Sequence, residues 1–187
     1  MSIKNQWKEK WVNQPGFMLI TVVIWSIFIG LCIKAGALIM NTTYSFFNPV
    51  VAKNLYEGLD LYGLLKENYW YYLGAVSFMI IIQVLKAVIF LLMIKIFLAI
   101  NLKQPFSLTI FNLIEKISYV SLQVGILTIF SSHYFKWLAK RGFDLPPVSP
   151  AYVSGAFEYL FMAALIYALA QVFKRGTEIQ SENELTV

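Results

Sequence analysis

Residues 73–100 read LGAVSFMIIIQVLKAVIFLLMIKIFLAI, a long apolar run with only two charged side chains, Lys86 and Lys95. About 20 helical residues, rising 1.5 Å each, cross the roughly 30 Å hydrocarbon core of a bilayer. Three more stretches are long and apolar enough to do so, at 17–40, 110–130 and 152–173. The sequence therefore predicts an all-α fold, an integral membrane four-helix bundle formed by one domain over residues 1–187.

The composition supports a chain that lives in the lipid bilayer. Hydrophobic residues make up 59% and charged residues 13% of the chain, whereas about a quarter of the residues in soluble domains are charged. The net charge is +5, but the basic residues are scattered in ones, twos and threes beside the spans. This pattern is typical of contact with lipid headgroups, and we expect no direct binding of nucleic acid.

The start of the chain has some features of a signal peptide, because three lysines precede an apolar run. The run at 17–33 is longer than the 7–15 residues usual for a cleaved signal, and Lys34 stands where small uncharged residues normally lead into the cleavage site. We therefore expect the first helix to be retained.

The connection between the first and second spans is rich in aromatic residues. Val51, Leu55, Leu59 and Tyr62 recur at helical spacing with charged residues on the other face, which predicts one short amphipathic interfacial helix. The run Tyr69-Trp70-Tyr71-Tyr72 is expected at the headgroups, because Tyr and Trp combine an apolar ring with a polar group.

Four spans place both termini on one side of the membrane. Lysines and arginines outside the spans number six on the side of the termini and five on the other (Lys4, Lys8, Lys10, Lys103, Lys174, Arg175; Lys53, Lys66, Lys136, Lys140, Arg141). Lys95 and Lys116 strengthen this slight bias. The positive-inside rule then predicts cytoplasmic termini in a bacterial cytoplasmic membrane protein, with a cytoplasmic tail at 174–187.

Polar side chains inside the spans are candidates for function, because a charge at the bilayer centre costs a few kcal/mol. The candidates are Gln83, Lys86, Lys95, Glu115 and Glu158. Lys86 lies near the middle of its span and shares a helix face with Gln83, three residues earlier. We expect a Lys95–Glu115 contact, and Glu158 is a candidate counter-ion for Lys86 despite its different depth. All of them could instead hold helices together or reach the interface.

The last span carries small residues at intervals of seven. Ala156, Ala163 and Ala170 predict a face for close helix packing, either within the chain or in a homo-oligomer.

Catalytic patterns are missing from the sequence. His133 is the only histidine, and there is no Gly-rich phosphate loop, Gly-x-Ser-x-Gly elbow or His-Glu-x-x-His motif. We therefore expect neither an enzyme nor a metal or cofactor site.

Two segments resemble a known family. They are the connection Lys103-Gln104-Pro105-Phe106-Ser107 and the ending FKRGTEIQSENELTV at 173–187. Both are similar to the bacterial membrane family catalogued as domain of unknown function 2975, whose members typically close with Phe-x-x-Gly, then Leu/Ile-Gln and Glu-Asn-Glu/Asp-Leu-Thr-Val/Ile. The matching residues of the tail include Gly176, Gln180, Glu182, Asn183, Leu185, Thr186 and Val187.

The resemblance implies a four-helix protein of the bacterial cytoplasmic membrane with no established activity, often encoded beside a small helix-turn-helix transcription regulator. We expect Gly176 to end the last helix in a left-handed turn and the rest of the tail to be a docking peptide. Our leading hypothesis is a non-enzymatic protein that docks a cytoplasmic regulator through this tail and the segment containing Lys103, Pro105 and Phe106. The rival hypothesis is a transporter, channel or ligand sensor that uses Lys86 and Gln83.

Overall fold

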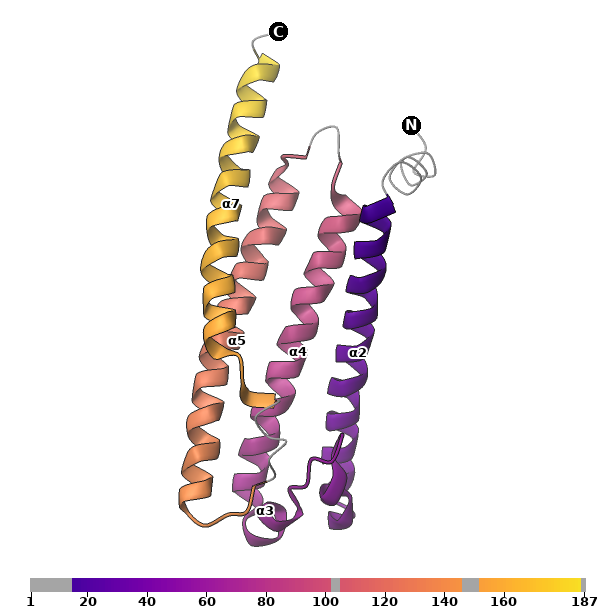
Figure 1. Cartoon of the computed structure of the whole chain (residues 1–187), viewed down its shortest axis with the longest axis vertical. Coiled ribbons are helices and arrows are strands. Elements are labelled where there is room, and N and C mark those ends of the chain that lie inside the picture. The colour runs from indigo at the N-terminus through magenta and orange to yellow at the C-terminus, as the bar shows by residue number, and fades with distance from the viewer. Residues whose placement is uncertain (1–14, 102–104, 146–151, 186–187) are drawn as a thin grey trace.

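The computed structural model describes residues 15–101, 105–145 and 152–185. The described residues include four long helices, α2 (Pro15–Ser45), α4 (Tyr69–Ala99), α5 (Leu108–Lys140) and α7 (Ala156–Leu185). They pack as a row in which α2 contacts α4, α4 contacts α5 and α5 contacts α7 (Figure 1). Each is long and apolar enough to span a membrane, which confirms the predicted all-helical bundle.

Local polar residues set where the second and third long helices begin. The Asn68 side chain accepts hydrogen bonds from the backbone N–H of Trp70 and Tyr71 and so caps α4. Ser107 caps α5 in the same way through the N–H of Ile110. Such caps satisfy amides that the first helical turn leaves unpaired.

All four long helices are longer than a hydrocarbon core. They have 30–33 residues, so at 1.5 Å per residue they are about 45–50 Å long against a core of about 30 Å. The α5 helix continues to Lys140, past residue 130, where we predicted that the third membrane span ends.

The connection between α2 and α4 forms two short helices where we expected one. They are η1 (Pro49–Asn54) and α3 (Tyr62–Glu67). Glu57 and Gly58 adopt positive φ angles of 49° and 79°, which interrupt a right-handed helix between them. The predicted apolar positions Leu55 and Leu59 are nevertheless fully buried.

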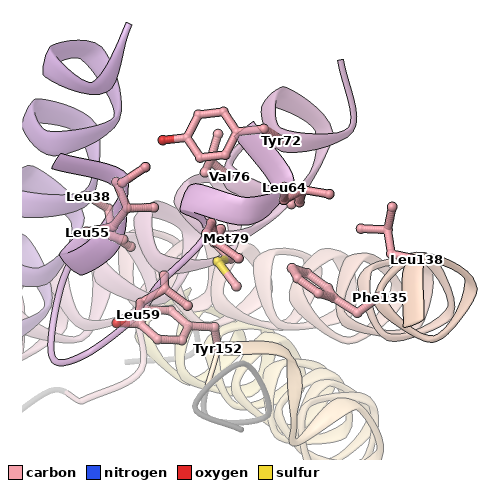
Figure 2. Packing of buried hydrophobic residues seen from close by; sticks show 13 residues of the cluster. Leu38, Leu55, Leu59, Leu64, Tyr72, Val76, Met79, Phe135, Leu138 and Tyr152 are labelled. Carbon is pink, nitrogen blue, oxygen red and sulfur yellow. The ribbon is translucent and has the colours of Figure 1, made fainter. Parts of the chain in front are cut away.

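A hydrophobic core closes the end of the bundle that carries η1 and α3, which we call the loop end. Figure 2 shows Leu38, Leu55, Leu59, Tyr72 and Met79 converging there with residues of α5 and with Tyr152. Tyr72 is completely buried and shares a hydrogen bond of 2.7 Å with Ser45, so its ring packs inside the protein. Trp70 is 73% exposed, as an interfacial aromatic residue should be.

The last long helix begins beside the middle of α5. A Cβ atom on Gly125 would lie 3.2 Å from the carbonyl oxygen of Ala156, which fixes the start of α7 at that level. From there α7 runs antiparallel to α5 and then continues past it (Figure 1). We call the end where α2 begins and α7 ends the terminal end.

The alanine face of α7 packs against α5 within the same chain. Ala163 is 4% exposed and Ala170 is fully buried, and the Ser118 hydroxyl of α5 donates a 3.0 Å hydrogen bond to the Ala163 carbonyl oxygen. The prediction of close packing is confirmed. These two alanines are covered by α5 and so are not available to pair with a second copy.

Candidate functional site

The two segments that resemble the family motif touch each other at the terminal end. The Phe106 ring lies 5.3 Å from the Phe173 ring, centroid to centroid. It also lies over Gly176, where an added Cβ would come within 2.5–2.8 Å of three atoms of the Phe106 ring. Gly176 therefore allows the α4–α5 connection to approach α7 closely.

Gly176 does not end the last helix, and the prediction of a left-handed turn there is wrong. α7 remains helical to Leu185. The glycine is required by the close contact with Phe106 and not by a turn. The Thr177 hydroxyl donates to the Phe173 carbonyl oxygen, and Arg175 forms an ion pair of 2.8 Å with Glu178. Residues 174–185 of the predicted tail thus continue the helix of the last span.

The segment of α7 after Gly176 projects beyond the other long helices (Figure 1). Its surface includes Ile179, which is 47% exposed, and the exposed Glu182, while Gln180 is partly buried. The predicted docking residues Lys103, Thr186 and Val187 lie outside the described residues, as do the side chains of Asn183 and Leu185.

Inside the bundle, Lys86 contacts an aromatic ring and not a carboxylate. Its Nζ atom lies 5.2 Å from the centroid of the Tyr159 ring, in the first turn of α7. The ion pairs among the described residues are Lys34–Glu57 and Arg175–Glu178. The candidate counter-ion Glu158 therefore forms no ion pair with Lys86. Glu158 instead borders a mainly apolar cavity of about 630 Å³ beside α5.

Gln83 lies one helical turn from Lys86 and is 2% exposed. Its side chain lies on the same face of α4 as that of Lys86, three residues later.

Lys34 of α2 joins this group, although the sequence did not identify it as a candidate. Ser45 and Tyr72 are hydrogen-bonded at the loop end of the antiparallel helices α2 and α4. Lys34 lies eleven residues before Ser45, and Gln83 lies eleven residues after Tyr72. Because the two helices are antiparallel, Lys34 and Gln83 lie at one level. A comparison of the depths of polar residues in the first and second spans could have identified Lys34 from the sequence.

Aromatic rings surround the Lys34 ammonium group. Its Nζ atom lies 4.2 Å from the centroid of the Tyr152 ring, 5.9 Å from that of Tyr56 and 4.0 Å from a Glu57 carboxylate oxygen. The Tyr152 hydroxyl donates to the Tyr56 carbonyl oxygen at 3.3 Å, which ties the Tyr152 side chain to the backbone of Tyr56. We call Lys34, Gln83 and Lys86 the polar cluster.

The charge of Lys34 acts on Lys86. Like charges repel each other more strongly within a protein than in water. The cluster therefore carries an excess of positive charge.

The other predicted pair, Lys95 with Glu115, is not in ion-pair contact. Lys95 is exposed and forms no ion pair within the residues that the structure describes. Glu115 instead acts electrostatically on Tyr119, four residues along the same helix. The described residues also contain no group of three or more potential metal ligands.

A family model described as Protein of unknown function (DUF2975) matches residues 64–187. The chain belongs to this family. No curated protein and no solved structure matches the chain. The DUF2975 match includes the Phe106–Gly176 contact together with Gln83 and Lys86, whereas Lys34 and Glu57 precede it. The resemblance drawn from the two short segments is confirmed.

Proposed function

We propose that this DUF2975 protein is a non-enzymatic membrane protein that docks a cytoplasmic partner through the terminal end of the bundle. The partner we propose is a helix-turn-helix transcription regulator. The observation that carries the proposal is the contact of Phe106 with Phe173 and Gly176, which joins both motif segments into one surface at the base of the projecting helix.

The projecting part of α7 is suited to binding. An isolated helix of about ten residues is marginally stable in water because nucleation is costly. Here the segment after Gly176 continues a helix that is already held by α5, so it is folded before a partner arrives. Such preorganisation lowers the entropy lost on binding.

The proposal requires the terminal end to face the cytoplasm. The structure has four candidate membrane spans, and α2 begins at the same end at which α7 ends (Figure 1). The basic residues outside the spans slightly favour that end as the cytoplasmic one, and the first helix usually dominates orientation.

The docking proposal is tested by co-expression with the regulator encoded beside the gene, followed by affinity purification of the membrane protein. We expect Ile179→Asp, and removal of Thr177–Val187, to reduce recovery of the regulator at least tenfold. Phe47→Asp is the matched control, because Phe47 is 83% exposed at the loop end. Equal recovery with the shortened and the full-length chain would remove the tail from the mechanism.

A second candidate function is a ligand sensor, transporter or channel that uses Lys86 and Gln83. The observation that favours it is that Lys86 has no carboxylate partner among the described residues. Buried charges that serve only structure are normally paired.

A further inference from the structure

The polar cluster brings hydrogen-bond donors from two helices to one level of the bundle. Gln83 and Lys86 share a face of α4, being three residues apart. Lys34 reaches the same level from α2, because Lys34 and Gln83 each lie eleven residues from the hydrogen-bonded pair Ser45 and Tyr72. The charge of Lys34 also acts on Lys86.

The negative charge near the cluster does not balance its positive charge. Glu57 lies 4.0 Å from the Lys34 Nζ atom, but its side chain is 63% exposed, so water screens its charge. Tyr152 and Tyr159 offer ring faces to the lysines. Cation–π contacts of this kind contribute about 0.5–2 kcal/mol and leave the net charge unchanged.

Gln83 adds a neutral donor to the two ammonium groups. It is 2% exposed, and its amide carries two N–H donors. An amide N–H beside two ammonium groups is suited to an acceptor oxygen that carries negative charge.

We propose that Lys34, Gln83 and Lys86 bind the carboxylate or phosphate group of an anionic ligand. The two ammonium groups neutralise its charge and the Gln83 amide donates to one of its oxygens. The rings of Tyr152 and Tyr159 close the site on the side of α7. This site is distinct from the docking surface at the terminal end, and it gives the protein a ligand as well as a partner.

The source of the anion is either the bilayer or the surrounding water, and two probes distinguish them. The full-length protein is placed in nanodiscs of zwitterionic lipid and titrated with sodium laurate, an anionic amphiphile, or with inorganic phosphate. Binding is followed by the rise in melting temperature, since a ligand that binds only the folded state stabilises it. Saturation by laurate alone indicates entry from the bilayer, and saturation by phosphate indicates entry from water.

Lys34→Gln and Lys86→Gln should each weaken binding of the effective probe at least tenfold. Lys95→Gln is the matched control, because Lys95 lies on the same helix, is exposed and has no ion pair within the described residues. Failure of both probes to raise the melting temperature, or equal weakening by all three substitutions, overturns the proposal.

The melting temperature of Lys86→Gln separates ligand binding from folding. Without a probe, Lys86→Gln should melt no lower than the wild type, because the substitution removes a repelling charge. A large fall in melting temperature with unchanged probe affinity would instead assign Lys86 a purely structural role and refute the proposal.

Glu57→Gln should tighten binding, because it removes the carboxylate that competes for Lys34. Ile179→Asp should leave probe affinity unchanged, so failure of the docking proposal is distinguishable from failure of this one.

Discussion

Substitution of Gly125 by alanine should destabilise the bundle, although alanine is the better helix former. Gly125 lies in α5 where α7 begins. A Cβ atom there would lie 2.7 and 2.8 Å from Leu160 Cδ2 and Cγ and 3.2 Å from the carbonyl oxygen of Ala156. The backbone oxygen cannot move without shifting the start of α7.

The size of the effect follows from two opposing terms. The higher helix propensity of alanine favours the variant by up to about 1 kcal/mol. Overpacking at a tight interface typically costs about 1–3 kcal/mol. Gly125→Ala should therefore lower the free energy of unfolding by roughly 0–2 kcal/mol.

Gly36→Ala in α2 is the matched control, because nothing lies within 4 Å of a Cβ atom added there. This variant gains helix propensity without the clash. The two alanine variants should thus differ by about 1–3 kcal/mol, and in a chain of this size each kcal/mol shifts the melting temperature by about 2–4 °C. The assay is thermal unfolding of both variants in the same detergent.

Leu160→Ala tests whether the clash is the cause. Combined with Gly125→Ala it removes Cγ and Cδ2 from the contact, so the double mutant should recover part of the loss as a coupling energy. Should Gly125→Ala and Gly36→Ala melt together, or should Leu160→Ala bring no recovery, the close approach of α5 and α7 would be refuted.

Three more predictions concern single polar groups. Ser131→Ala should stabilise the protein by about 1 kcal/mol in thermal unfolding, because the Ser131 hydroxyl is buried without a hydrogen-bond partner. Ser118→Ala in the same helix should instead destabilise it by about 0.6–1.5 kcal/mol, since it breaks the hydrogen bond to the Ala163 carbonyl oxygen; a gain in stability would contradict that bond. Burial raises the pKa of Tyr152 from its ordinary 10 to about 12. The folded state therefore keeps a proton that the unfolded chain loses, and stability should fall as the pH rises from 10 to 12. Tyr152→Phe should flatten this part of the stability profile, and an unchanged profile would show that Tyr152 does not cause it.

Hydropathy revealed the long helices because each contains about 20 apolar residues, but it did not reveal where they end. The outer part of α5, from Ser131 to Lys140, is polar and aromatic and resembles a loop by composition. It is helical because Phe135 and Leu138 pack into the core at the loop end and the Tyr134 hydroxyl donates to the Tyr71 carbonyl oxygen. Tyr71 lies 63 positions from Tyr134, so a local pattern could not predict this contact.

The candidate site was also predictable only in part, because a local pattern shows residues of one helix and not their neighbours on other helices. Gln83 and Lys86 were identifiable because they interrupt an apolar run and share a helix face. The neighbours of Lys86 were not identifiable, since Tyr159 and Lys34 come from other helices. Glu158 was a candidate because of its charge, despite its different depth. Gly176 was misinterpreted because a glycine near a helix end usually signals a left-handed cap, whereas here it accommodates the Phe106 ring.

The unbroken course of α7 has a mechanical consequence. A helix of 30 residues is about 45 Å long, and it behaves as a lever because it lacks proline over its whole length. A tilt of about 5° at Ala156, beside the ring that covers Lys86, would sweep the far tip near Leu185 through about 4 Å. A small rearrangement at the start of α7 would thereby become a larger displacement at its far tip.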